Sequence, residues 1–313
     1  MKVFGPVPSR RLGNSLGINN IPAKTCSYNC VYCQLGRTLE KETERAPFYK
    51  PQEISREAKT KVEKILEVGD KIDYLTFVAD GEPTLDLNLG REIEMLRPLG
   101  FKIAVITNGS LISRKDVREE LAQADWVSLK VDCIREQMWR RVNRPQPTLQ
   151  LPKILEGMLV FASSFQGELT TETMLVRGLN DKSDQLQELA IFLKQLQPEK
   201  GYLSVPTRPP AERWVEPPLE GVLNQAYQVV SEHLGRVECL TGHETTDFSF
   251  SGDPAEDILS ITAVHPLRHV ALVKVLQQRE TDFSVVERLL EKGKLLKLEY
   301  RGETFYMRKL PGR

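Results

Sequence analysis

The stretch YLTFVADGEPTLD, residues 74–86, joins a β-rich apolar run to a polar turn. Runs rich in β-branched and aromatic residues are typical of strands, and the sequence Gly-Glu-Pro, taken alone, is typical of a turn. Four comparable runs follow along the chain: KIAVIT (102–107), WVSLKV (126–131), TTETMLV (170–176) and GYLSVP (201–206). Their spacing suits repeated βα units and does not suit hairpins.

Amphipathic segments with apolar residues at helical spacing alternate with these runs. They cover residues 54–68, 88–100, 113–124, 151–165 and 183–197. With a first strand near SLGI (15–18), the pattern predicts about six strands and an α/β fold, a partial (β/α)6 TIM-type barrel. The carboxyl ends of barrel strands meet at one face, so the chemistry is expected there.

Polar residues stand at or near the ends of these strands, as that expectation requires. The first of the runs is followed by Gly81, Glu82 and Pro83, a tight turn with exposed backbone groups that could bind a charged or amide-bearing ligand. The others carry Asn108, Ser128, Lys130, Asp132 and Arg177. These residues are the candidates for a binding site.

The repeat ends at a Pro-rich passage, PTRPPAERWVEPP (206–218), after which a helix (223–234) and a possible strand, RVECL (236–240), are expected. Residues 253–313 then show three short helical patterns followed by a hairpin across Arg301-Gly302. Three helices and a two-stranded wing outline a winged helix. We therefore expect a barrel domain at 1–245 and a small winged helix domain at 253–313.

Charge gives little indication of a partner for the whole chain. The 313 residues include 43 basic and 43 acidic side chains, but the first 39 residues hold five basic side chains and no acid. That local excess suits either an anionic ligand or a solvated basic face. Because no apolar stretch reaches the length of a membrane span, we expect a cytoplasmic protein with no membrane partner.

Three of the five cysteines lie close together in KTCSYNCVYCQLG (24–36), namely Cys26, Cys30 and Cys33. Structural zinc and all-cysteine clusters normally use four protein ligands, so three thiolates leave one position open for a cofactor or substrate. A zinc site would need a further ligand, and the distance of the four histidines (His233, His243, His265 and His269) neither excludes nor supports it. Cys133 and Cys239 fit small buried residues, with a substrate contact at Cys133 as the alternative reading.

The spacing C-x3-C-x2-C, with an aromatic residue before the last cysteine, resembles the radical S-adenosylmethionine (radical SAM) superfamily. The resemblance implies that these cysteines hold three irons of a 4Fe-4S cluster and that S-adenosylmethionine binds the fourth. It implies an oxidoreductase that makes a 5'-deoxyadenosyl radical, which removes hydrogen from a substrate. By the same resemblance, Gly81, Glu82 and Pro83 receive the methionine amino group and Tyr32 lies beside the adenine. Ser128, Lys130, Asp132 and Arg177 then hold ribose or carboxylate, with Asn108 nearby.

Within that superfamily, FGPVPSRRLGNSLGI (4–18) and the cysteine motif most resemble the Fe-S oxidoreductases grouped with tRNA wyosine-base synthases. Archaeal wyosine synthases carry an extra N-terminal cysteine set for a second cluster. This chain departs from them, because no cysteine precedes Cys26 and two spare cysteines are too few for a second cluster.

Two functions from different classes remain. The first is an enzyme that acts on an RNA base, a peptide or a small metabolite and takes electrons from a donor such as flavodoxin or ferredoxin. The alternative is an Fe-S redox-sensing regulator whose winged helix binds nucleic acid. Its expected recognition helix, residues 283–292, balances two acids against two bases, and such a neutral helix binds phosphates poorly. A peptide-docking, dimerisation or capping role for this domain is also open.

Overall fold

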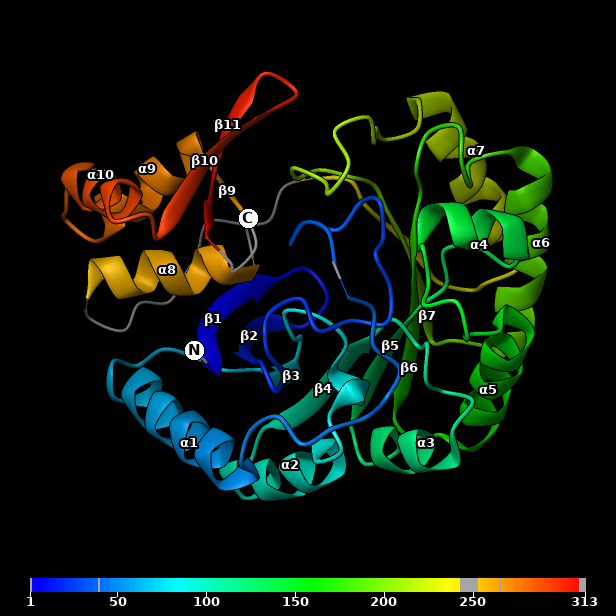
Figure 1. The fold of residues 1–313 in the computed structure, drawn as a ribbon, viewed down its shortest axis with the longest axis horizontal. Helices are drawn as coiled ribbons and strands as arrows, with labels where there is room; N and C mark the ends of the chain where they lie inside the picture. The colour runs from blue at the N-terminus through cyan, green and yellow to red at the C-terminus, as the bar shows by residue number, and fades with distance from the viewer. Residues whose placement is uncertain (1, 39, 243–252, 265, 310–313) are drawn as a thin grey trace.

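The computed structural model describes residues 2–38, 40–242, 253–264 and 266–309. A single sheet curls into part of a barrel, with helices outside it (Figure 1). Its eight strands are β1 (Val3–Ser9), β2 (Gly13–Ile18), β3 (Tyr74–Phe77), β4 (Lys102–Thr107), β5 (Trp126–Lys130), β6 (Glu168–Met174), β7 (Lys200–Ser204) and β8 (Val237–Leu240). The helices of this part are α1 (Pro51–Glu67), α2 (Leu89–Leu96), α3 (Lys115–Leu121), α4 (Glu136–Val142), α5 (Leu151–Ser164), α6 (Ser183–Leu196) and α7 (Glu220–Ser231), with short 3-10 helices η1 (Pro83–Leu85) and η2 (Arg97–Leu99).

The strands lie in the sheet in chain order, and all neighbours from β2 to β8 are parallel. This arrangement confirms the α/β class and the TIM-type half-barrel, because each helix carries the chain back to start the next parallel strand. The expected count of about six strands was low. β8 coincides with the possible strand RVECL, and β1 was not expected at all.

β1 pairs antiparallel with β2 at the edge of the sheet. Its sequence, VFGPVPS, contains two prolines, which cannot donate to a ladder and therefore do not resemble a strand. An edge position tolerates them because one side of the strand needs no partner. Helix α4, of seven residues, was also missed.

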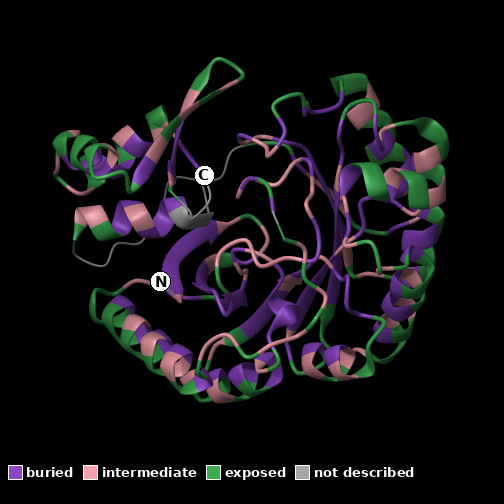
Figure 2. Ribbon diagram, in the orientation of Figure 1, coloured by how far each residue is buried: buried purple, intermediate pink, exposed green. Residues whose placement is uncertain are grey.

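The core lies between the sheet and the apolar stripes of the helices (Figure 2). Helix α1 begins with Pro51 at its first turn, where a missing N–H costs nothing. Ile54, Ala58, Val62 and Ile65 then recur at helical spacing and are buried against the barrel. Burial of each large aliphatic side chain contributes about 1.5–3 kcal/mol. This packing fixes the strand ends that carry the site.

Residues 253–264 and 266–309, here called the C-terminal unit, follow the order helix, strand, helix, helix, hairpin. The elements are α8 (Pro254–Val264), β9 (Leu267–Arg268), α9 (His269–Gln278), α10 (Ser284–Glu291), β10 (Leu295–Tyr300) and β11 (Glu303–Arg308). The hairpin turns through Arg301 and Gly302, both at positive φ as a tight two-residue turn requires. The three predicted helices and the hairpin are present, and β9 adds a third strand beside β11.

The C-terminal unit has its own apolar cluster, which includes Val7 of the edge strand β1. The Ser260 hydroxyl in α8 also accepts a 2.9 Å hydrogen bond from the backbone N–H of Gly5. The unit is therefore packed on the barrel edge. The predicted domain boundary at 245 and two of the histidines, His243 and His265, lie outside the described residues. No helix of the described part is long and apolar enough to cross a membrane.

Candidate active site at the carboxyl ends of the strands

The three clustered cysteines lie in a long loop between β2 and α1, here called the cysteine loop (residues 19–50). Backbone hydrogen bonds join it to the end of α4, from Val31 N–H to the Val142 carbonyl at 2.9 Å and from Asn29 N–H to the Asn143 carbonyl at 3.0 Å. The loop presents three reduced, partly buried thiols, those of Cys26, Cys30 and Cys33. The fold thus carries them to the carboxyl ends of the strands.

Two amide side chains donate to the sulfurs. Asn108 Nδ2 lies 3.6 Å from Cys26 Sγ, and Asn143 Nδ2 lies 3.4 Å from Cys30 Sγ. Burial raises the pKa of the Cys30 thiol to about 12, and the nearby Asp132 carboxylate adds to the effect. Neutral donors of this kind are what cluster sulfurs receive from a protein, and they tune the cluster potential.

The three thiols are the ligand type that iron-sulfur clusters use. In the described part of the chain, no group of three or more His, Cys, Asp or Glu side chains is placed to hold one metal ion. A 4Fe-4S cluster does not require such convergence, because each thiolate binds a different iron. The donor set therefore fits a cluster with three protein thiolates and one open iron.

The Gly-Glu-Pro turn is joined to the cysteine loop by the backbone. Lys24 N–H donates to the Asp80 carbonyl at 2.6 Å, and Glu82 N–H donates to the Thr25 carbonyl at 2.9 Å. A Cβ atom at Gly81 would lie 1.9 Å from the Thr25 carbonyl oxygen, so only glycine permits this approach. The turn is thus more than a chain reversal, since it positions the loop that carries the thiols.

The side chain of Glu82 is buried beneath that turn, and both of its carboxylate oxygens accept hydrogen bonds. Its carboxylate accepts hydrogen bonds from Thr84 N–H at 3.0 Å, Thr107 Oγ1 at 2.5 Å and Asn108 N–H at 2.7 Å. Burial raises its pKa, and these donors act in the opposite direction. The carboxylate therefore links the turn to the end of β4. The expectation of exposed backbone groups was wrong, because Glu82 and Pro83 are buried and Gly81 is half-buried beneath the cysteine loop.

Asp132 links the cysteine loop to strand β6. Its carboxylate accepts from the Tyr32 hydroxyl, from Asn143 Nδ2 at 2.6 Å and from the backbone N–H of Met174 at 2.8 Å. The residue is buried. With three donors already on its two oxygens, Asp132 positions the residues around Cys30 rather than offering a free carboxylate.

Lys130 and Glu172 form a buried charge cluster on the inner face of the sheet. Glu172 accepts from Lys130 Nζ at 2.9 Å, from Ser204 Oγ at 3.0 Å and from the Arg11 guanidinium. Lys130 Nζ also lies 5.1 Å from the centre of the Tyr32 ring. Burial alone would raise the pKa of Glu172, but the two cations outweigh it and hold that pKa well below its usual range.

The other predicted residues are placed differently. Ser128 is buried in β5, and its hydroxyl has no hydrogen-bond partner among the described residues. Arg177 pairs with Glu216 and donates to the Pro217 carbonyl at 3.0 Å, away from the thiols. Cys133 is buried, as expected of a small apolar side chain.

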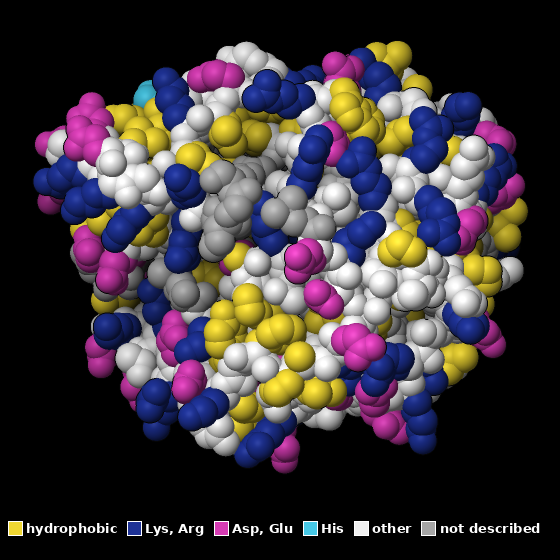
Figure 3. Space-filling model, in the orientation of Figure 1, with side chains coloured by type: hydrophobic (Ala, Val, Ile, Leu, Met, Phe, Trp, Pro, Cys, Tyr) yellow, Lys and Arg dark blue, Asp and Glu magenta, His cyan; other side chains and the backbone are white. Residues whose placement is uncertain are grey.

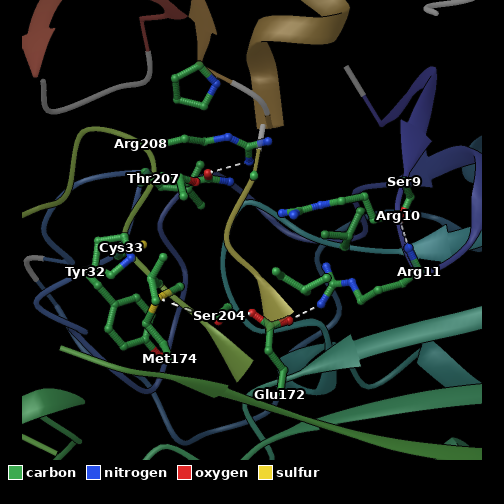
Figure 4. Close-up of a pocket in the computed structure, with 18 of the residues that line it drawn as sticks. Ser9, Arg10, Arg11, Tyr32, Cys33, Glu172, Met174, Ser204, Thr207 and Arg208 are labelled. Atoms are coloured by element: carbon green, nitrogen blue, oxygen red, sulfur yellow. Dashed lines mark hydrogen bonds and ion pairs between the residues drawn. The ribbon is translucent and has the colours of Figure 1, made fainter. Parts of the chain in front are cut away.

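A cavity of about 320 Å³ opens beside this cluster (Figure 4). The residues at its inner end come from the cysteine loop and from strands β5 to β7: Tyr32, Cys33, Lys130, Glu172, Met174 and Ser204. Arg11, Glu172 and Ser204 were not among the predicted site residues. The charged Glu172 in the middle of an otherwise strand-like run was the signal that could have identified it.

The comparisons agree with this geometry. The Radical SAM superfamily profile matches residues 20–190. A radical SAM methyltransferase from Sphaerobacter thermophilus shares the fold at 14% identity and a TM-score of 0.56, over 73% of this chain and 67% of that one. TYW1 with a lysine-pyruvate adduct bound is similar at 16% identity and a TM-score of 0.52, over 72% and 76% of the two chains.

The chain belongs to the radical SAM superfamily, whose members bind a 4Fe-4S cluster and S-adenosylmethionine. It is similar over nearly its whole length to UPF0026 protein MJ1312 of Methanocaldococcus jannaschii. The two are 47% identical over 312 residues, which is 99% of this chain and 97% of the relative.

Proposed function

We propose that this protein is an enzyme that reductively cleaves S-adenosylmethionine and oxidises a bound substrate by removing a hydrogen atom. When bound, the cluster and S-adenosylmethionine supply one-electron cleavage of the sulfonium. The observation that carries the proposal is a loop with three half-buried thiols, joined through Gly81 and Glu82 to the strand ends of a radical SAM barrel. The protein supplies three ligands where a cluster held only by protein uses four, so one position remains for the cofactor.

The chain's own residues have distinct parts in this proposal. Cys26, Cys30 and Cys33 bind the cluster. The backbone of Gly81, Glu82 and Pro83 receives the methionine amino group, and the free hydroxyl of Ser128 binds the cofactor from β5. Tyr32, held by Asp132 and by the nearby Lys130, lies beside the adenine.

Asn108 acts through Cys26 and Glu82, to which it is hydrogen-bonded. Arg177 has the least support among the predicted binding residues, because its guanidinium already pairs with Glu216 and donates to the Pro217 carbonyl.

The C-terminal unit, together with the residues around it that the structure does not describe, is proposed to be the winged helix domain of residues 253–313, following a barrel domain at 1–245. Its support is the order helix, strand, helix, helix, hairpin. The nucleic-acid-binding regulator is not favoured, because the similarities are to radical SAM proteins and α10 carries two acids against one base. A one-electron donor such as flavodoxin or ferredoxin and an RNA, peptide or small-molecule substrate complete the proposal. Five free cysteines suit the reducing cytoplasm.

Anaerobically reconstituted protein with dithionite tests the proposal. It should convert S-adenosylmethionine to 5'-deoxyadenosine, measured by chromatography and mass spectrometry. Cys30→Ala should abolish the product, whereas Cys239→Ala, a half-buried thiol on β8, should leave it unchanged. Equal product from wild type and Cys30→Ala would refute the assignment.

A further inference from the structure

The cavity beside the thiols extends beyond the barrel to the C-terminal unit. Its outer wall includes Leu267 and Arg268 of β9, Ala271 of α9 and Phe305 of β11. These residues lie more than 200 positions from the cysteine loop in the sequence. The C-terminal unit is therefore a wall of the same cavity, and not an independent appendage.

The outer end of the cavity is strongly basic. Among all its described lining residues are five cations and one acid, and the acid, Glu172, is at the inner end with Arg11 and Lys130. The outer end keeps Arg10, Arg208 and Arg268, and no carboxylate of a described residue lines it. In Figure 4, Arg10 and Arg208 extend into the cavity from opposite sides. Figure 3 shows Lys and Arg side chains spread over this face of the molecule.

Neighbouring groups orient two of these arginines. Arg208 Nη1 donates to the neutral Gln34 Oε1 at 2.9 Å, and Arg268 Nη1 lies 3.3 Å from the half-exposed Glu303 carboxylate. Guanidinium groups held in place can bind an oxyanion through two parallel hydrogen bonds. Helix α9 starts directly after Arg268, with no side-chain cap on its first amides, and a helix N-terminus also favours an anion.

The remaining wall is mostly apolar, and its polar members are Ser9, Gln34, Ser204 and Thr207. Val205, Leu240, Leu267 and Phe305 contribute to it. A volume of about 320 Å³ is at the small end of the range for metabolite sites and cannot admit a folded macromolecule. The lining thus combines a basic end with an apolar body at the scale of a small molecule.

We propose that the substrate of this enzyme is a small molecule carrying a phosphate or carboxylate group, which Arg10, Arg208 and Arg268 bind at the outer end of the cavity. The C-terminal unit supplies part of the substrate site. This inference rests on the proposed function, because it assigns the inner end to the cofactor. It also names a role for the C-terminal unit that involves no nucleic acid.

Calorimetric titration of the cluster-loaded, full-length protein with inorganic phosphate, pyrophosphate and succinate tests the inference. At least one of the three should bind, and the preferred probe distinguishes a phosphate site from a carboxylate site. Arg208→Gln and Arg268→Gln should each weaken that binding about tenfold, the effect of one charge-assisted hydrogen bond. The matched control is Arg236→Gln, which removes an exposed guanidinium at the start of β8 and should change binding less than twofold.

Several results would overturn the inference: no binding of any probe at millimolar concentration, equal loss in the control, or competition between the anion and S-adenosylmethionine. The two cavity variants lie on different elements, so a folding defect in one, detected by circular dichroism, leaves the other as the test. Production of 5'-deoxyadenosine by the wild type is measured separately. Anion binding without any such production would refute the proposed function and leave the anion site standing.

Discussion

Asp132→Asn is expected to loosen the cysteine loop, because the Asp132 carboxylate accepts from a residue on the loop, from Asn143 after α4 and from the backbone of β6. An asparagine has one acceptor oxygen. If this oxygen keeps the bond from Met174 N–H, the new amide N–H groups face the Tyr32 hydroxyl and Asn143 Nδ2, which now both donate. Hydrogen bonds to charged groups contribute about 1.5–3 kcal/mol each. The loss of two such hydrogen bonds, partly recovered by rotation of the tyrosine hydroxyl, should lower the free energy of unfolding by about 2–4 kcal/mol.

Urea unfolding of the reduced, iron-free protein measures this cost as a fall in the free energy of unfolding. Reconstituted Asp132→Asn should also retain less iron per chain than the wild type. The control is Asp73→Asn, an exposed carboxylate that accepts one backbone hydrogen bond, from Asn14 at 2.7 Å, and should cost below about 1 kcal/mol. A loss at Asp132 no larger than that of the control, with normal iron content, would contradict the role assigned to this residue.

Three further outcomes are expected. Glu172→Gln leaves two half-buried cations, Arg11 and Lys130, without their carboxylate and should lower the free energy of unfolding by about 3 kcal/mol at pH 7. Folding lowers the pKa of Glu172, so the carboxylate stabilises the folded protein at pH values above its unfolded pKa. The difference in unfolding free energy between wild type and variant should therefore shrink as the pH falls through the folded pKa. A difference that grows in acid would contradict this. Gly81→Ala should lose about 2 kcal/mol or more and assemble no cluster, whereas Gly221→Ala, in open helical space, should gain up to about 1 kcal/mol; equal stability of the two variants contradicts this. Burial raises the pKa of Cys30 to about 12, so iron loading must displace a proton and should strengthen from pH 6.5 to pH 8.5; loading independent of pH would show that the thiol is already ionised.

The sequence predicted the parts of the fold that depend on local periodicity. The parallel strands β3 to β7 carry runs rich in β-branched and aromatic residues, and the long helices α1, α5 and α6 carry clear 3.6-residue patterns; all appear close to the expected positions. β1 was missed because its prolines are acceptable only at an edge, and the edge is a property of the whole sheet. β9, with two residues, carries no pattern of its own.

The candidate site was predictable where one short motif holds the chemistry. The three thiols and the Gly81 turn could be identified because their residue types are specific. Asp132 and Glu172 show what could not be predicted from the sequence. Residue type marks both as unusual near strand ends, but only the fold determines that Asp132 is saturated by its neighbours while Glu172 joins Arg11 across 161 positions of sequence.

Electron paramagnetic resonance of the dithionite-reduced protein, recorded with and without S-adenosylmethionine, tests the central claim most directly. An iron without a protein ligand should bind the added compound and change the g values of the reduced cluster, in wild type and in Cys239→Ala alike. An identical spectrum with and without S-adenosylmethionine, from protein with a full iron content, would contradict the account.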